Sequence, residues 1–117
     1  PPRRNFDLPI IQKLISAYKQ WQSFIHHLPK QTRYTLGEKI DLLFIEIFEL
    51  ITTARYLPQN QKSPVIQRAS LKLDTLKFFL EISWEIKMID TKKYILLSKS
   101  LDEIGKILGG WKKQISQ

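Results

Sequence analysis

The stretch TLGEKIDLLFIEIFELITTARYLP, residues 35–58, decides the fold. Its apolar residues recur at steps of three and four, which is the period of one face of an α-helix. That face carries Leu36, Ile40, Leu43, Phe44, Ile47, Ile51 and Ala54. Thr35 and Glu38 have the spacing of a capping box, in which a hydroxyl and a carboxylate satisfy opposed backbone amides. The stretch therefore predicts an amphipathic helix over residues 35–57 that begins at a capping box and ends before Pro58.

The same periodicity extends outward from this helix in both directions. It predicts three further helices, over residues 8–28, 64–88 and 91–113. Asp7 is the expected N-cap of the helix over residues 8–28, and Asp90 is that of the helix over residues 91–113. Ser63 and Pro64 begin the helix over residues 64–88. Four amphipathic helices with three short connections predict an all-α fold, an antiparallel up-down-up-down four-helix bundle, as a single domain over residues 1–117.

The composition excludes several classes of protein. The 117 residues contain no Cys and two His, so disulfide frameworks, iron–sulfur clusters and thiolate zinc sites are excluded. The longest apolar stretch, residues 42–51, is interrupted by Glu46 and Glu49 and is far shorter than the roughly 20 residues of a membrane span. We expect a cytoplasmic protein without a membrane partner.

An excess of positive charge points to polyanionic partners. Nineteen Lys and Arg against eleven Asp and Glu give a net charge of +8, which favours nucleic acid, an anionic membrane surface or an acidic protein. On the helix over residues 91–113, Lys92, Lys99, Lys106 and Lys113 recur every seven residues. They form one row with a spacing of about 10.5 Å that can meet phosphates. The alternative is a solvated lysine face without a partner.

Two smaller basic groups are further candidates for nucleic-acid binding. Lys30 and Arg33 flank Tyr34 in the predicted loop between the first two helices, where cations can hold phosphate and the ring can stack on a base. The alternative is a loop in which the Tyr34 ring packs against the protein and binds nothing. Arg68 and Lys72 lie one turn apart inside an apolar arc of the helix over residues 64–88, where long side chains can snorkel at an interface or a ring lining.

Two helices carry more apolar surface than a monomeric bundle needs. On the helix over residues 35–57, two apolar residues point away from the core stripe, and the helix over residues 64–88 has a second apolar stripe. The spare residues are Leu42, Ile45, Leu71, Phe78, Ile82 and Ile86. We expect them to form an oligomer interface. The alternative is that they are apolar residues scattered over the surface, or that the helices of one chain pack at an angle that covers them.

No motif in the sequence supports catalysis. A P-loop needs a glycine-rich turn that closes on Gly-Lys-Ser/Thr, whereas Gly109 and Gly110 precede Trp111. A di-iron bundle needs Glu three residues before His, which neither His26 nor His27 has. We expect no catalytic residue, no metal site and no cofactor.

Three segments together resemble a known family. They are RYTLGEKI at residues 33–40, LKL leading to LKF at residues 71–78, and LDEIGKILGGWK at residues 101–112. The sequence resembles the accessory variability determinant (Avd) family of diversity-generating retroelements over about residues 8–113. The most specific similarity is Glu-Ile-Gly followed by Leu-Gly-Gly-Trp. The family belongs to a wider group of bacterial four-helix bundles that includes proteins encoded in ribosomal RNA intervening sequences.

The resemblance implies a function as well as a fold. It implies a non-enzymatic, basic homopentameric ring that binds the reverse transcriptase of the retroelement together with RNA and DNA, and that supports mutagenic retrohoming. It also suggests that Gly105, Gly109 and Gly110 allow another backbone to approach closely, the alternative being helix capping or fraying. The alternative function is a protein-only oligomeric adaptor of the wider bundle group.

The sequence departs from the family on the helix over residues 64–88. Family members are often basic at the positions of Lys77 and Glu81, and here the second position is acidic. This departure shifts the expected nucleic-acid contacts to Arg68 and Lys72, to the lysine row and to the segment around Arg33.

Overall fold

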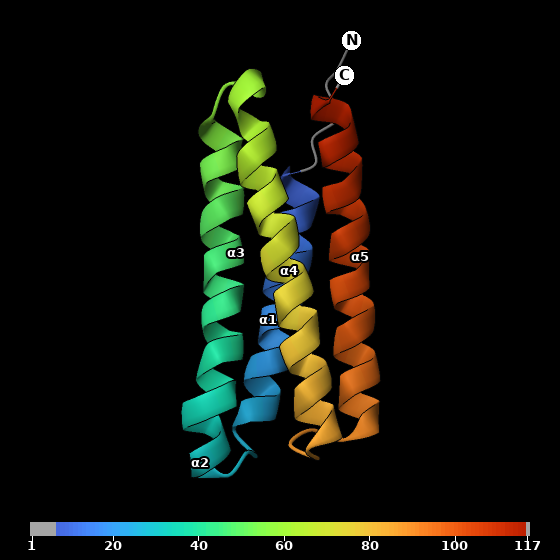
Figure 1. Ribbon diagram of the computed structural model, residues 1–117. Coiled ribbons are helices and arrows are strands. Elements are labelled where there is room, and N and C mark those ends of the chain that lie inside the picture. Colours follow the sequence, from blue (N-terminus) through green and yellow to red (C-terminus); the bar gives the residue numbers. More distant parts are fainter. Residues whose placement is uncertain (1–6, 117) are drawn as a thin grey trace.

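Four long helices lie side by side in the computed structural model, which describes residues 7–116 (Figure 1). They are α1 (Asp7–Ile25), α3 (Glu38–Tyr56), α4 (Lys62–Glu85) and α5 (Thr91–Ile115). Three short elements join them: α2 (Lys30–Thr32), the π-helical turn η1 (Arg33–Gly37) and the 3-10 turn η2 (Gln59–Gln61). Consecutive long helices alternate in direction and residues 7–116 contain no strand, so the predicted four-helix bundle is confirmed.

The order of the helices around the bundle determines which faces point outward. Both α1 and α4 pack against α3 and α5, so α3 and α5 are diagonal to each other and run in the same direction. The bundle measures 50 × 22 × 19 Å. Its α3–α4 end holds the last turns of α3 and α5 and the first turn of α4, at the top of Figure 1. Within residues 7–116, no helix combines the length and the apolar composition that a membrane span requires.

Each long helix contributes one apolar row to a single core. Trp21 of α1, Phe44 of α3, Leu76 of α4 and Leu101 of α5 have no solvent-exposed surface. The row predicted for residues 35–57 is confirmed, because six of its seven members are buried and Leu36 packs partly buried against the core. Burial of such a side chain stabilises the fold by about 1.5–3 kcal/mol.

The predicted capping box at Thr35 is wrong. The helical backbone begins at Lys30, directly after Pro29, and continues through η1 into α3. The Thr35 hydroxyl donates to the carbonyl oxygens of Gln31 at 3.2 Å and Thr32 at 3.4 Å. Because the chain is already helical there, the backbone amides at the start of α3 pair with preceding carbonyls and leave no donor for a cap.

Four other helix boundaries differ from the prediction by two or three residues, among them the end of α5, which is at Ile115 and not at residue 113. The first long helix ends at Ile25, not at residue 28, and α4 begins at Lys62, two residues before Pro64. Helix α4 ends at Glu85 because Lys87 adopts a left-handed φ of 65°. The carbonyl of Ser83 then accepts the amides of Met88 and Ile89 at 2.8 and 3.3 Å, which closes the helix end.

The predicted N-cap at Asp90 is confirmed, and its contribution to the free energy of unfolding can be measured. Its Oδ1 accepts the backbone amide of Lys93 at 2.8 Å. We predict that Asp90→Ala lowers the free energy of unfolding by about 1 kcal/mol, because an orphan amide of α5 loses its acceptor. Thr35→Ala is the matched control and changes stability by less than about 0.5 kcal/mol, since Thr35 caps nothing. Urea denaturation followed by circular dichroism measures both; equal losses would contradict this assignment of caps.

Candidate nucleic-acid and subunit interfaces

The lysine row, Lys92, Lys99, Lys106 and Lys113, lies on the outward face of α5. All four side chains are exposed, on the face opposite the buried Leu97 and Leu101. Among the ion pairs between described residues, none involves these four amino groups. The row therefore presents positive charge along α5 that is not used in an ion pair between described residues.

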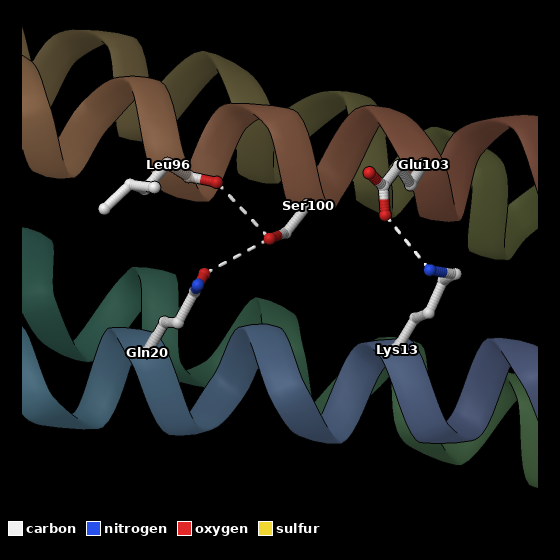
Figure 2. Close-up of polar contacts among 5 residues, drawn as sticks. All are labelled: Lys13, Gln20, Leu96, Ser100 and Glu103. Atoms are coloured by element: carbon white, nitrogen blue, oxygen red, sulfur yellow. Dashed lines mark hydrogen bonds and ion pairs between the residues drawn. The ribbon is translucent and has the colours of Figure 1, made fainter.

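Neighbouring helices neutralise the two carboxylates beside the lysine row. Lys77 of α4 pairs with Asp102 at 3.1 Å, and Lys13 of α1 pairs with Glu103 at 3.0 Å. Figure 2 shows the second pair crossing from α1 to α5. The hydrogen bond from Lys13 and its charge hold the pKa of Glu103 below its usual value, and the charges of Lys99 and Lys106 lower it further. Other helices thus compensate these carboxylates and leave the lysine row available.

A second polar contact links the same two helices, two turns away along α1 and one turn away along α5. The Ser100 hydroxyl donates to Oε1 of Gln20 at 3.2 Å and also contacts the carbonyl of Leu96 at 3.3 Å (Figure 2). Together with the pair between Lys13 and Glu103, this contact links α1 to α5.

The segment around Arg33 is helical, which corrects the predicted loop. Lys30 opens α2 and is exposed, and Tyr34 in η1 is exposed as well. Arg33 folds back on the chain: its Nη2 donates to the carbonyl of Leu28 at 3.3 Å, and its Nε is buried without a hydrogen-bond partner among the described residues. The turn presents Lys30 and Tyr34 to solvent, whereas Arg33 is partly withdrawn.

A hollow of about 320 Å³ lies behind this turn, between α1, η1 and α3. Its lining includes a hydrogen-bonded cluster, because Oδ1 of Asp41 accepts from the Tyr18 hydroxyl at 2.9 Å and from Nε2 of Gln22 at 2.8 Å. Burial raises the pKa of Tyr18, and the hydrogen bond to Asp41 and its charge raise it further. The Tyr18 ring also meets Phe44 edge-on, with centroids 5.2 Å apart. The cluster ties α1 to α3.

The structure gives Arg68 and Lys72 different roles. Nζ of Lys72 pairs with Oε2 of Glu46 at 2.9 Å and so links α4 to α3. Arg68, one turn away, is exposed. The charge of Lys72 is compensated within the chain, and Arg68 is the better candidate of the two for an external anion.

The six spare apolar residues form a strip over the neighbouring helices α3 and α4. Five of them are 40–58% exposed and Ile82 is half-buried. The exposed members are Leu42, Ile45, Leu71, Phe78 and Ile86. We call these six residues the apolar strip. Large apolar side chains exposed on two neighbouring helices make this surface a candidate for a subunit contact.

The glycines of α5 are not explained by close packing within the chain. A Cβ on Gly105 would meet only side-chain atoms of α4, namely Nζ of Lys77 at 3.4 Å and Cδ2 of Leu73 at 3.5 Å. A Cβ on Gly109 would meet nothing within 4 Å. The backbone contact suggested by the sequence is therefore not made inside the described chain at either position.

Helical periodicity did not identify several exposed residues. On α5, Ile95 and Leu96 are exposed beside the lysine row. At the α3–α4 end, Tyr56 is 78% exposed, next to Arg55. A signal for this end was present in the sequence, because residues 50–73 contain no Asp or Glu.

Comparison with known proteins identifies a family. A family model described as bAvd-like matches residues 9–115, which include nearly all of the four long helices. No curated protein and no solved structure matches the chain.

The cluster at Asp41 makes a pH-dependent contribution to stability. We predict that Tyr18→Phe, which keeps the ring, lowers the free energy of unfolding at pH 7 by about 1–2 kcal/mol, because Asp41 loses a donor. The pKa of Tyr18 is raised above 10.0 in the folded protein. Its contribution is therefore complete below pH 10 and is lost as the pH rises through the folded pKa.

Urea denaturation of both proteins from pH 7 to pH 11 tests this prediction. The difference between them stays constant up to about pH 9 and shrinks above pH 10. Tyr34→Phe, which removes a hydroxyl from an exposed ring, is the control and costs little at any pH. A difference that grew above pH 10 would contradict the role assigned to the hydrogen bond.

Proposed function

Because the chain belongs to the bAvd-like family, we propose that it is a non-enzymatic accessory protein of a diversity-generating retroelement. In this role it binds the reverse transcriptase and nucleic acid, both RNA and DNA, and supports mutagenic cDNA synthesis and retrohoming in the cytoplasm. The observation that carries the proposal is the family match over residues 9–115. The lysine row supports the nucleic-acid part of the role.

The lysine row suits sequence-independent contact with phosphates. Its side chains are separated by about 10.5 Å along one helix face and can follow a backbone without reading bases. Each phosphate contact releases counterions, so affinity falls steeply with salt and depends little on sequence. Because Asp102 and Glu103 are paired to other helices, they weaken this attraction less than free carboxylates would.

The apolar strip supports self-association. A stable contact buries about 800 Å² on each partner, and apolar residues at its centre supply much of the free energy. The strip lies on α3 and α4, whereas the lysine row lies on α5. Subunits that met through the strip would leave their lysine rows available, and we propose a homopentameric ring as the assembly.

The protein-only adaptor is the second candidate, and the same apolar strip favours it. An adaptor needs the subunit contact but not the lysine row. The two proposals therefore differ in nucleic-acid binding, which the following prediction measures.

We predict that Lys99→Glu together with Lys106→Glu lowers the affinity for RNA by at least about tenfold, because attraction to phosphates becomes repulsion. Fluorescence anisotropy with a labelled structured RNA at about 50 and 200 mM salt measures the effect. The slope of log affinity against log salt falls by about 0.9 for each phosphate that the variant no longer neutralises.

Lys19→Glu together with Lys39→Glu is the matched control. It makes the same charge change at exposed positions on α1 and α3, away from the lysine row. The control retains most of the affinity, and both double variants keep the helical circular dichroism spectrum. Equal losses of affinity in the two double variants would show that net charge, not the position of the lysine row, determines RNA binding. If the wild-type protein binds no RNA, the protein-only adaptor is the remaining proposal.

We predict that Leu71→Glu or Phe78→Glu dissociates the oligomer, because a charge is then buried at a subunit contact. Light scattering on a size-exclusion column measures the mass, which for the wild type is a multiple of 13.9 kDa. Ile95→Glu is the control, since Ile95 and Phe78 are equally exposed at 57% and Ile95 lies outside the apolar strip. A wild-type monomer, or variants that kept the wild-type mass, would refute the interface.

A further inference from the structure

The α3–α4 end of the bundle concentrates positive charge. The sequence contains no Asp or Glu between Glu49 and Asp74, and none after Glu103. Because α3 and α5 end where α4 begins, the fold brings these two segments together (Figure 1). They carry Arg55, Lys62, Arg68, Lys72, Lys106, Lys112 and Lys113. The sequence shows only that both segments lack carboxylates. The tertiary structure places the two segments at the same end, where together they form a basic surface.

The opposite end differs in charge. The carboxylates Glu38, Glu81, Glu85 and Asp90 lie near the starts of α3 and α5 and the end of α4. Cations accompany them there, so this end is less basic than the α3–α4 end but is not acidic; they are Lys30, Arg33, Lys39, Lys87, Lys92 and Lys93. The start of α1, at Asp7, lies toward the basic end instead. Net positive charge is therefore greater at the α3–α4 end than at the opposite end of the 50 Å bundle. A polyanion approaching the bundle is directed to the α3–α4 end.

The Lys62 side chain makes contacts within the α3–α4 end and is not available to an external anion. Its Nζ donates to the carbonyl of Ala54 and to that of Arg55 at 3.3 Å, where α3 leaves carbonyls without helical partners. It also lies 5.9 Å from the centroid of the Trp111 ring. Lys62 therefore joins α3, α4 and α5, while Arg68 and Lys113 remain exposed for phosphate.

Tyr56 is the most unusual feature of the α3–α4 end. It is the last residue of α3 and is 78% exposed, the largest exposed fraction among the large apolar side chains described. The Arg55 guanidinium carbon lies 5.7 Å from its ring centroid. Leu57 and Pro58 follow in extended conformations, with ψ of 150° and 152°, so the chain turns away directly after the ring. An exposed aromatic ring beside cations is the arrangement on which proteins stack unpaired bases.

We infer that the α3–α4 end is a binding site for single-stranded nucleic acid, in which Tyr56 stacks on an unpaired base while Arg68, Lys112 and Lys113 contact phosphates. The inference rests on the proposed nucleic-acid role and adds a preference for single strands. A base inside a duplex is covered by its neighbours, so the Tyr56 ring reaches only unpaired or terminal bases. The lysine row contacts phosphates of either form.

The test compares Tyr56→Ala with wild type on two labelled probes, an oligouridylate and a long blunt-ended RNA duplex, at equal salt. Tyr56→Ala weakens binding of the oligouridylate about 5- to 150-fold, the usual effect of removing one stacking ring, and changes binding of the duplex less than about twofold. Tyr56→Phe, which keeps the ring, retains wild-type affinity. Ile15→Ala, which removes an exposed apolar side chain of α1 away from the lysine row and the apolar strip, is the control and changes neither probe.

The outcomes separate this inference from the proposed function. Unchanged oligouridylate binding by Tyr56→Ala, with the lysine-row variant still weakened, would overturn the stacking site alone. Equal loss on both probes would also overturn it, since stacking acts only on the single strand. Wild-type protein that bound neither probe at low salt would overturn the nucleic-acid role and this inference together. Thermal denaturation of each variant verifies that it is folded.

Discussion

The burial of one apolar face from each long helix is the constraint on which the rest of the structure depends. Trp21, Phe44, Leu76 and Leu101 come from four different helices and are all fully buried. Because hydrophobic burial is favourable in proportion to area and has no preferred direction, four such faces converge on one axis. Every remaining face then points outward, and its composition is free to serve contacts with other molecules.

The outward faces divide into surfaces with different chemistry. Ion pairs between helices, such as Lys72 with Glu46 and Lys77 with Asp102, use carboxylates that would otherwise offset the basic surface. Exposed pairs of this kind contribute little to stability, about 0–1 kcal/mol each. Their larger effect is on the surface potential: the lysine row on α5 takes part in no ion pair between described residues, while the apolar strip occupies α3 and α4. The proposed subunit contact and the proposed polyanion contact therefore do not compete for the same surface.

Much of the fold could be predicted because its signals are local. The apolar row of residues 35–57 was recognised from spacings of three and four residues, and the Asp90 cap from an Asp directly before a periodic segment; both are confirmed. The capping box at Thr35 failed although its spacing was right, because Pro29 starts the helical backbone earlier and no amide remains to be capped. Among the candidate site residues, the exposure of the lysine row followed from periodicity. The pairing of Lys72 did not, because Glu46 lies on another helix.

The sequence by itself determined where the helices form, which face of each is apolar, and that the chain carries a charge of +8. These properties depend on residues within one or two turns of each other, over which helical geometry is nearly invariant. Tertiary structure alone decided which charges are compensated and which segments share an end. Lys13 and Glu103 are 90 positions apart and form an ion pair. Tyr56 and Lys113 share the basic end because α3 and α5 run in parallel across the core, an arrangement set by packing between helices.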